Sequence, residues 1–585
     1  MIELAKAYES HIWEAFIEPI RSVLIVDDKY PTIEQVLVAQ ADNKQLVPQT
    51  NPKEVLNVIK NFRNRDPALI VDIHNGEGDG NDRVTLSQHL HQSDLLILDY
   101  ELNDRGEKAV EIVKKVFSNK HFNLIVLHTS SQPIEPFERI LMSFLSPCVS
   151  DLGKNDQITS GRDVIQDAED VDPNVFNKVR AALNFQQYIT FRREPRTALK
   201  SIREGAPPFT EFHQITRDFG WEKQTPSNVF YWALSEFERT NSTVFNTESR
   251  HDVRWSDVAQ GGPHWVRTNQ GFITFVQKAE DVDLINKLLK ALSDWKPSPS
   301  RLLSSKLRAT LEEEGVLAED IALSSRHAQA KFYQNLISVD NEEFKHALID
   351  AQLDRHLELL SSHIKPTVRE YLTKVVGVNL NGIGIGELTK HHYNVDLSDG
   401  NENERAIREY NSYISCKPNI TGWHLETGHI FELNGEKWVC LSPICDLVPN
   451  QKNIGVFQDV GTGRKPFMAV KLHCKTGPLD TKINSNNYLF IKGVNQIGEI
   501  EQYSFYDSTD NAASPHWSLF IADDSGRIQG DNTITINKLA SSGQQMSLNN
   551  CQCKIVAQLR YEYALNLLQK LGSNFTRVGL DFIAH

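Results

Sequence analysis

Three short, largely apolar segments near the N-terminus each end in polar side chains that could carry chemistry. These side chains are Asp27 and Asp28 after residues 22–26, Asp99 after residues 95–98, and Thr129 after residues 123–128. Apolar runs of this length are typical of strands buried on both faces of a parallel sheet. In such sheets the carboxyl ends of the strands meet at one edge, where ligands bind. We therefore expect three carboxylates and one hydroxyl to lie together at that edge.

The predicted cluster of carboxylates is suited to a magnesium ion. Neighbouring carboxylates repel one another, and a hard cation relieves the repulsion by taking their oxygen atoms as ligands. Because Mg²⁺ keeps several waters, a few acids and a substrate phosphate complete its coordination. With the hydroxyl of Thr129 and a lysine, for which Lys154 is the candidate, such a site is equipped to receive a phosphoryl group on a carboxylate.

The segment from about residue 20 to residue 155 resembles the receiver domain of two-component response regulators. The residues that carry the likeness are Asp27, Asp28, Asp99, Gly106 at the start of the next helix, and Thr129. The segment is most similar to divergent receivers of bacterial conflict and phage-defence systems, which work with a dedicated histidine kinase. The resemblance implies a flavodoxin-like, doubly wound parallel sheet.

The resemblance also implies a role for each site residue. Asp99 would accept a phosphoryl group from a histidine kinase or phosphotransfer protein, Thr129 would be the switch hydroxyl, and Lys154 would pair with the phosphoryl oxygens. The implied ligands of Mg²⁺ are the carboxylates of Asp27, Asp28 and Asp99 and the main-chain carbonyl of Glu101. The sequence departs from the family where Asn155 replaces the usual proline, and an alternative is a degenerate receiver that serves as a structural binding module.

Length and composition set the class of protein. A chain of 585 residues is expected to hold about three or four domains. Its net charge of −14 argues against a dominant non-specific nucleic-acid surface, but leaves a local basic patch open. No segment approaches the ~20 apolar residues that span a bilayer, and the first residues do not resemble a secretory signal. We therefore expect a cytoplasmic protein without a membrane partner.

The predicted fold class is α/β, with three regions that differ in their predicted secondary structure. Residues 1–156 are expected to form the receiver-like domain with an N-terminal helix, and residues 157–395 a mainly helical middle domain. The helical texture of the middle region is interrupted by the strand-like run Gly271–Val276. Residues 396–585 are expected to form a β-rich α+β domain with a closing helix over 559–571. Within it, Asn434-Gly435 predicts a hairpin turn.

The C-terminal region, which also resembles the region that accompanies such receivers, contains six of the seven cysteines. A zinc site built from Cys440, Cys445, Cys474 and a fourth ligand is imaginable, but the spacings are not those of paired Cys-x-x-Cys motifs. Apolar neighbours favour free, buried thiols instead. Zinc is therefore not expected in this region.

These patterns favour a response regulator that accepts a phosphoryl group and does not turn over a substrate. The receiver would relay its state to a helical and β-rich effector or adaptor region, with downstream defence effectors as partners and with dimer formation as a possibility. An alternative is an effector enzyme that acts on nucleic acid, with its site in residues 396–585.

Overall fold

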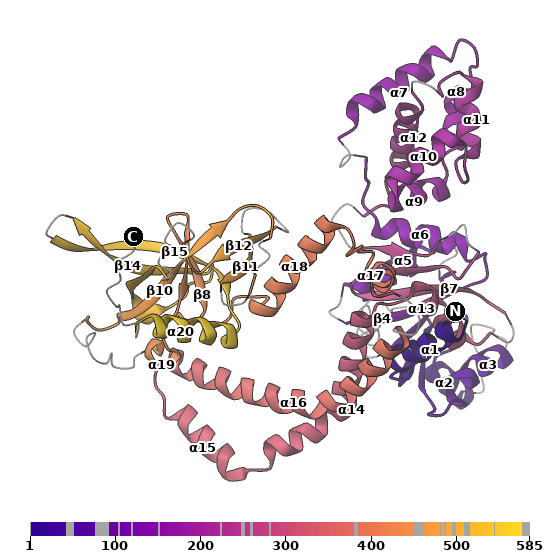
Figure 1. Cartoon of the computed structure of the whole chain (residues 1–585). Helices are drawn as coiled ribbons and strands as arrows, with labels where there is room; N and C mark the ends of the chain where they lie inside the picture. Colours follow the sequence, from indigo (N-terminus) through magenta and orange to yellow (C-terminus); the bar gives the residue numbers. More distant parts are fainter. Residues whose placement is uncertain are drawn as a thin grey trace. The chain divides into compact units, whose positions relative to one another are not determined.

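The computed structural model divides the chain into two compact units. The first comprises Met1–Ala309 and Val368–Val378, and the second comprises Thr310–Thr367 and Asn379–His585 (Figure 1). The residues that the structure describes are 2–42, 52–76, 93–102, 106–118, 121–149, 153–222, 225–246, 252–257, 261–279, 282–379, 384–449, 460–479, 483–484, 487–493, 499–507, 515–542 and 545–575.

The first unit is organised around a sheet with the strand order β2-β1-β3-β4-β7-β6-β5. Its strands are β1 (Ser22–Val26), β2 (Ile70–His74), β3 (Leu95–Asp99), β4 (Asn123–Thr129), β5 (Arg254–Trp255), β6 (Trp265–Arg267) and β7 (Gly271–Gln277). The strands from β2 to β7 in this order are parallel, and β6 and β5 extend the edge in antiparallel pairing. Every residue of β3 and β4 is buried, which explains their apolar composition.

Helices cover both faces of this sheet, as predicted for a doubly wound fold. Their bounds are η1 (Trp13–Ile17), α3 (Pro52–Arg63), α5 (Glu107–Phe117), α6 (Ile134–Phe144) and α13 (Leu284–Trp295). Leu96 and Leu98 share one core cluster with α5 and α6, whereas Ile97 shares the other cluster with η1, α3 and α13. The alternation along β3 thus divides the core into two layers. The unit also includes α1 (Ile2–Ile12) and α2 (Ile33–Ala41).

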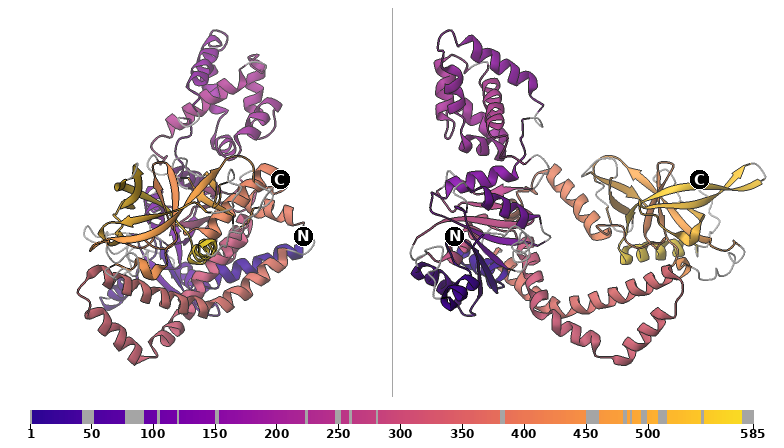
Figure 2. Two further views of the ribbon diagram at one scale, coloured as in Figure 1. Left: turned by 60° about the vertical axis from the view of Figure 1, so that its left-hand side comes forward. Right: turned by 180° about the vertical axis from the view of Figure 1, so that it is seen from behind.

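A bundle of six helices is inserted between β4 and β7 (Figure 2). Its helices are α7 (Asn155–Asp167), α8 (Val175–Ala181), α9 (Phe185–Arg193), α10 (Pro195–Glu204), α11 (Thr210–Asp218) and α12 (Pro226–Thr240). The central helix α12 buries a continuous segment, from Val229 to Leu234, and this segment is apolar. Gly161 of α7 lets the two helices approach closely, since a Cβ there would lie 2.2 Å from the carbonyl oxygen of Asn228.

This insertion changes the expected domain boundaries. The boundary predicted at residues 156 and 157 falls inside the first unit. The run Gly271–Val276, which the sequence placed within a helical middle domain, is strand β7 of the N-terminal sheet. Two long helices, α14 (Pro299–Leu323) and α16 (Glu342–Asn379), contribute residues to both units.

The second unit is built on a sheet that closes on itself. Its strand order is β11-β12-β10-β13-β14-β15-β8-β9, and a further pairing of β9 with β10 completes a ring. The strands are β8 (His429–Leu433), β9 (Glu436–Cys440), β10 (Lys465–Lys475), β11 (Tyr488–Lys492), β12 (Ile500–Ser504), β13 (Trp517–Ala522), β14 (Thr533–Ser542) and β15 (Gln545–Gln558). The helices are α15 (Arg326–Ile337), α17 (Ile385–Tyr393), α18 (Gly400–Ser415), α19 (Ile444–Leu447) and α20 (Tyr561–Phe575). The predicted β-rich ending with a closing helix is confirmed.

The closed sheet encloses one core and carries a second core beside α20. Phe431, Trp438, Phe467 and Phe520 belong to the first cluster, while Leu567 of α20 belongs to the second. Asn434 and Gly435 both have positive φ values, of 52° and 78°, as the predicted hairpin turn requires. No helix in the described part of the chain has the length and apolar character needed to cross a membrane.

Candidate functional site

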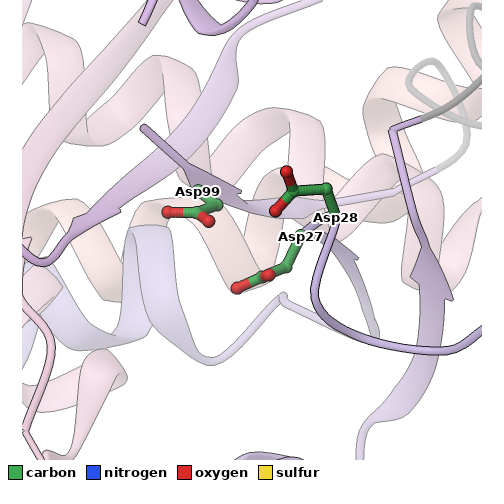
Figure 3. Close-up of side chains that lie close together, drawn as sticks. All are labelled: Asp27, Asp28 and Asp99. Carbon is green, nitrogen blue, oxygen red and sulfur yellow. The ribbon is translucent and has the colours of Figure 1, made fainter. Parts of the chain in front are cut away.

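The carboxyl ends of β1 and β3 bring three aspartates together (Figure 3). Asp27 and Asp28 follow β1, Asp99 ends β3, and one carboxylate oxygen of each lies within 4.8 Å of the others. The parallel pairing of β1 with β3 places Val26 beside Leu98, so the acids that follow lie at the same edge. Asp27 is 3% exposed and Asp99 is 1% exposed. The three acids predicted from the sequence therefore form one cluster, in which Asp27 and Asp99 are buried and Asp28 is half-buried.

A lysine from a distant part of the chain completes the cluster. Lys278 directly follows β7, and its Nζ lies 2.8 Å from Asp99 Oδ1 and 3.2 Å from Asp27 Oδ2. Its backbone N–H donates to the carbonyl oxygen of Thr129 over 2.7 Å, which continues the pairing of β7 with β4. Burial lowers the pKa of Lys278, but the charges and hydrogen bonds of Asp27 and Asp99 raise it by more. The pKa of Lys278 therefore lies above its usual value. The lysine is therefore held as a cation against two acids.

The lysine predicted from sequence lies elsewhere. Lys154 precedes α7, and its Nζ lies over the ring of Tyr231, 5.9 Å from the ring centre. The resemblance places the lysine after the fifth strand, with Lys154 as the candidate, whereas the helical insertion delays the fifth parallel strand until Gly271. The available signal was the apolar run Gly271–Val276 followed by Gln277 and Lys278. That run belongs with the N-terminal strands.

Thr129, the last residue of β4, is fully buried and donates a hydrogen bond to the side chain of Glu101. The distance from Thr129 Oγ1 to Glu101 Oε1 is 2.6 Å. The same carboxylate oxygen accepts from the backbone N–H groups of Ser130 and Ser131, at 2.8 and 3.2 Å. The resemblance to receivers implies a role only for the main-chain carbonyl of Glu101. The position of its side chain is a finding of the structure.

The acids of the site differ in how burial and hydrogen bonding act on them. Burial, a hydrogen bond with Glu101 and the charge of Asp27 raise the pKa of Asp99, against the opposing effect of Lys278. Burial alone would raise the pKa of Glu101, but hydrogen bonds with Asp99, Thr129 and two backbone N–H groups hold it well below its usual value. Burial is also the main cause of the raised pKa of Asp28. The site therefore concentrates negative charge at a poorly solvated edge.

The donor set fits a magnesium ion. Among the described residues, Asp28 Oδ1 and Asp99 Oδ2 are buried carboxylate oxygens without a hydrogen-bond partner. Buried polar atoms normally have partners, so two such oxygens in one cluster are open to a ligand. Mg²⁺ prefers carboxylate oxygens and needs few of them from the protein. Asp27, Asp28 and Asp99 are thus suited to hold this ion.

A comparison with protein families decides the identity of this part of the chain. Residues 19–183 match the family model described as a response receiver domain. This part of the chain is a divergent receiver domain. A search of curated proteins and a search of solved structures each found no match. The family supports a phospho-acceptor role of the kind found in response regulators.

The receiver domain extends beyond the segment that matches the family. The match ends at residue 183, within the helical insertion and before β7. The fifth parallel strand and Lys278 complete the receiver sheet and its site, so both fall outside the matched residues. The receiver domain is therefore discontinuous in sequence, and its last part follows the inserted helices.

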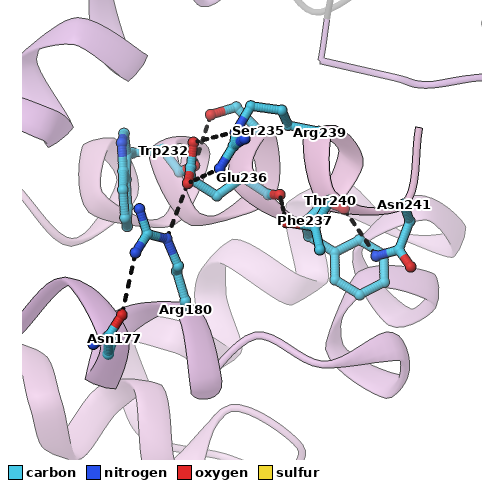
Figure 4. Close-up of polar contacts among 9 residues, drawn as sticks. All are labelled: Asn177, Arg180, Trp232, Ser235, Glu236, Phe237, Arg239, Thr240 and Asn241. Carbon is cyan, nitrogen blue, oxygen red and sulfur yellow. Dashed lines mark hydrogen bonds and ion pairs between the residues drawn. The ribbon is translucent and has the colours of Figure 1, made fainter. Parts of the chain in front are cut away.

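The inserted helices of the receiver carry a polar cavity of about 570 Å³. Arg180 is one of its lining residues: its Nε lies 2.9 Å from Glu236 Oε2 (Figure 4), and its guanidinium lies 5.4 Å from the ring centre of Trp232. Arg239 pairs with the same Glu236 oxygen at 3.0 Å. Because these charges are paired with one another, they support the packing of α8 against α12 and do not indicate a ligand site.

Proposed function

We propose that this protein is a response regulator whose receiver accepts a phosphoryl group on Asp99. The donor would be the phosphohistidine of a histidine kinase or of a phosphotransfer protein. The observation that carries the proposal is the contact of Lys278 with Asp99 and Asp27, at the sheet edge where Thr129 also lies. A buried acid, a cation and a hydroxyl at one edge are the groups that phosphoryl transfer to a carboxylate requires.

In the proposed reaction, a carboxylate oxygen of Asp99 attacks the phosphorus atom of the phosphohistidine. An O–P bond forms, the P–N bond breaks, and the imidazole leaves with the electron pair of that bond. Lys278 would hold the carboxylate in place beforehand and then balance the negative charge of the transferred group. When bound by Asp27, Asp28, Asp99 and the main-chain carbonyl of Glu101, Mg²⁺ would neutralise further charge on that group.

The relay of the phosphorylated state would begin at the end of β4. Thr129 lies there, and its carbonyl oxygen accepts the hydrogen bond of Lys278 N–H, so a shift of β4 reaches β7 directly. The chain leaves β4 into α6 and the inserted helices. We propose that these elements report the state of Asp99 to an effector or adaptor function, in bacterial defence signalling with downstream defence proteins as partners.

The binding of beryllofluoride, a phosphoryl mimic, tests the proposal. We expect wild type to bind it only in the presence of Mg²⁺, and we expect Asp99→Asn to lose binding. A calorimetric titration of the full chain measures both. Equal binding by wild type and by Asp99→Asn would contradict the phospho-acceptor role. The absence of binding in wild type would favour the degenerate receiver that serves as a structural module.

A second candidate function, binding of nucleic acid, rests on a cavity in the second unit. This cavity of about 790 Å³ is lined by four cationic side chains, Arg405, Lys417, Lys492 and Arg560. Among the described residues that line this cavity, Glu409 is the only acid, and it pairs with Arg405 at 2.9 Å. Cations in a groove are one feature of proteins that bind single strands. If charge reversal at Lys492 left the salt-dependent binding of labelled single-stranded DNA and RNA unchanged, this candidate would be wrong.

A further inference from the structure

Three hydrogen-bond donors at the end of β4 converge on one oxygen of Glu101. Thr129 Oγ1 donates over 2.6 Å, Ser130 N over 2.8 Å and Ser131 N over 3.2 Å, all to Glu101 Oε1. Ser131 N also lies 3.1 Å from Thr129 Oγ1, which holds the hydroxyl and the two amides as one group. Two consecutive N–H groups and a hydroxyl that point at one oxygen form an anion-binding site.

The anion in this site belongs to the chain itself. Glu101 lies two residues after Asp99, and its backbone N–H lies 3.3 Å from Asp99 Oδ1. The short connection therefore places a second carboxylate beside the phospho-acceptor. The other oxygen of this carboxylate, Glu101 Oε2, is buried and accepts from no N–H or hydroxyl donor among the described residues. The side chain is thus held by the donors of the β4 end, next to the Asp99 carboxyl, with which it also shares a hydrogen bond.

A phosphoryl group on Asp99 would need the same donors. The proposed role of Thr129 is to donate its hydroxyl to a phosphoryl oxygen, and this hydroxyl is fully buried against Glu101. A phosphoryl group adds about two negative charges at this place. Two anions cannot both take the single hydroxyl proton of Thr129, and like charges at close range repel each other.

We infer that Glu101 is an internal anion that occupies the phosphoryl-oxygen site of the unmodified receiver and leaves it when Asp99 is phosphorylated. This inference rests on the proposed function. Glu101 would keep Thr129 turned inward before any phosphorylation and would oppose the entry of a phosphoryl group. The exchange of one anion for another, and not the filling of an empty site, would then be the event that changes the surface near Asp99.

The affinity for beryllofluoride in Mg²⁺ tests the exchange. We expect Glu101→Ala to raise the affinity about tenfold or more over wild type, because the competing carboxylate is gone. Glu101→Gln is expected to give a smaller rise, since its amide oxygen can still accept from Thr129 although its charge is lost. Glu107→Gln, which removes a charge from an exposed side chain of α5, is the matched control and should bind as wild type does.

The possible outcomes separate the inference from the proposed function. If wild type binds the mimic, Asp99→Asn does not, and both Glu101 variants bind as wild type does, then the exchange is wrong and the phospho-acceptor role stands. If neither wild type nor any variant binds the mimic, including Glu101→Ala, then the exchange and the phospho-acceptor role are both wrong. Binding by Glu101→Ala in the absence of binding by wild type would support the competition by Glu101, but it would contradict the phospho-acceptor role of the wild-type chain. Thermal melts show whether each variant folds. If Glu101→Ala does not fold, the affinity of Glu101→Gln for beryllofluoride decides whether the exchange is correct.

Discussion

The ammonium group of Lys278 lies 2.8 Å from Asp99 Oδ1, although Asp99 ends β3 and Lys278 follows β7, and the entire helical insertion separates these strands in sequence. The contact exists because β4 lies between β3 and β7 in the sheet, so the carboxyl ends of all three strands face the same edge. A long connection between parallel strands is sterically allowed, since such strands always need a crossover. The receiver can therefore hold a large insertion without disturbing its site.

Replacement of Lys278 by Met should weaken the site for phosphoryl chemistry. Hydrogen bonds to charged groups are worth about 1.5–3 kcal/mol, and the variant removes the cation that contacts Asp99 and Asp27. We expect at least a tenfold loss of beryllofluoride affinity. Lys154→Met is the matched control and should bind as wild type does, because its ammonium lies over Tyr231. The reverse pattern would restore Lys154 as the lysine of the site.

The acids of the site could be predicted from sequence because each lies at the end of a strand that its own apolar residues identify. Residues 22–26 and 95–98 are apolar on both faces, and this alone indicates their place in a parallel sheet. The identity of the lysine depended on which later strand pairs with β4. That pairing is a long-range contact, which no local pattern encodes. The sequence therefore indicates a strand at Gly271–Val276 but assigns it to a different domain.

Two other features could not be predicted, for different physical reasons. The side chain of Glu101 lies just beyond a strand, where no periodicity fixes its direction, and only the donors of the β4 end determine its position. In the second unit, β15 alternates buried Cys553 and Ile555 with less buried residues. This pattern of burial is too weak to predict a strand. The segment forms one because it pairs with β14 on one side and with β8 on the other.

Magnesium should stabilise the receiver through its acids. A ligand that binds only the folded state adds about 2.7 kcal/mol at one hundred times its Kd, so thermal melts of the wild-type chain should shift upward with Mg²⁺ concentration. Asp28→Asn should lose most of the shift, because it removes one of the three clustered carboxylates. Asp156→Asn, at an exposed position of α7, should keep it. Equal shifts in all three proteins would indicate a general ionic effect.

The close approach of α7 and α12 predicts a strong effect of one added methyl group. In Gly161→Ala the new Cβ would lie 2.2 Å from the carbonyl oxygen of Asn228, which is a backbone atom and cannot rotate away. Overpacking of this kind costs about 1–3 kcal/mol of unfolding free energy. The control Gly315→Ala lies in α14 with no atom within 4 Å of the added carbon. It should stabilise its helix by about 1 kcal/mol, since alanine favours helices over glycine.

The second unit should lose stability in mildly acidic solution because it buries a neutral histidine. Burial lowers the pKa of His429 to about 3, and its Nδ1 accepts a hydrogen bond from the backbone N–H of Glu426 over 3.0 Å. The unfolded chain binds a proton at this residue near pH 6.5, whereas the folded unit excludes it down to about pH 3. Stability from this group is therefore complete above pH 6.5 and falls as the pH drops below it. Between pH 7.5 and 5.5 the loss should be about 1.4 kcal/mol.

Urea unfolding of the full chain at several pH values measures this dependence. His429→Gln should change less in unfolding free energy between pH 7.5 and 5.5 than wild type does, whatever its absolute stability, because the group that takes up the proton on unfolding is absent. The control His391→Gln, at an exposed position of α17, should keep the wild-type dependence. If His429→Gln kept it as well, other groups would account for the acid sensitivity, and neutral burial of His429 would not contribute.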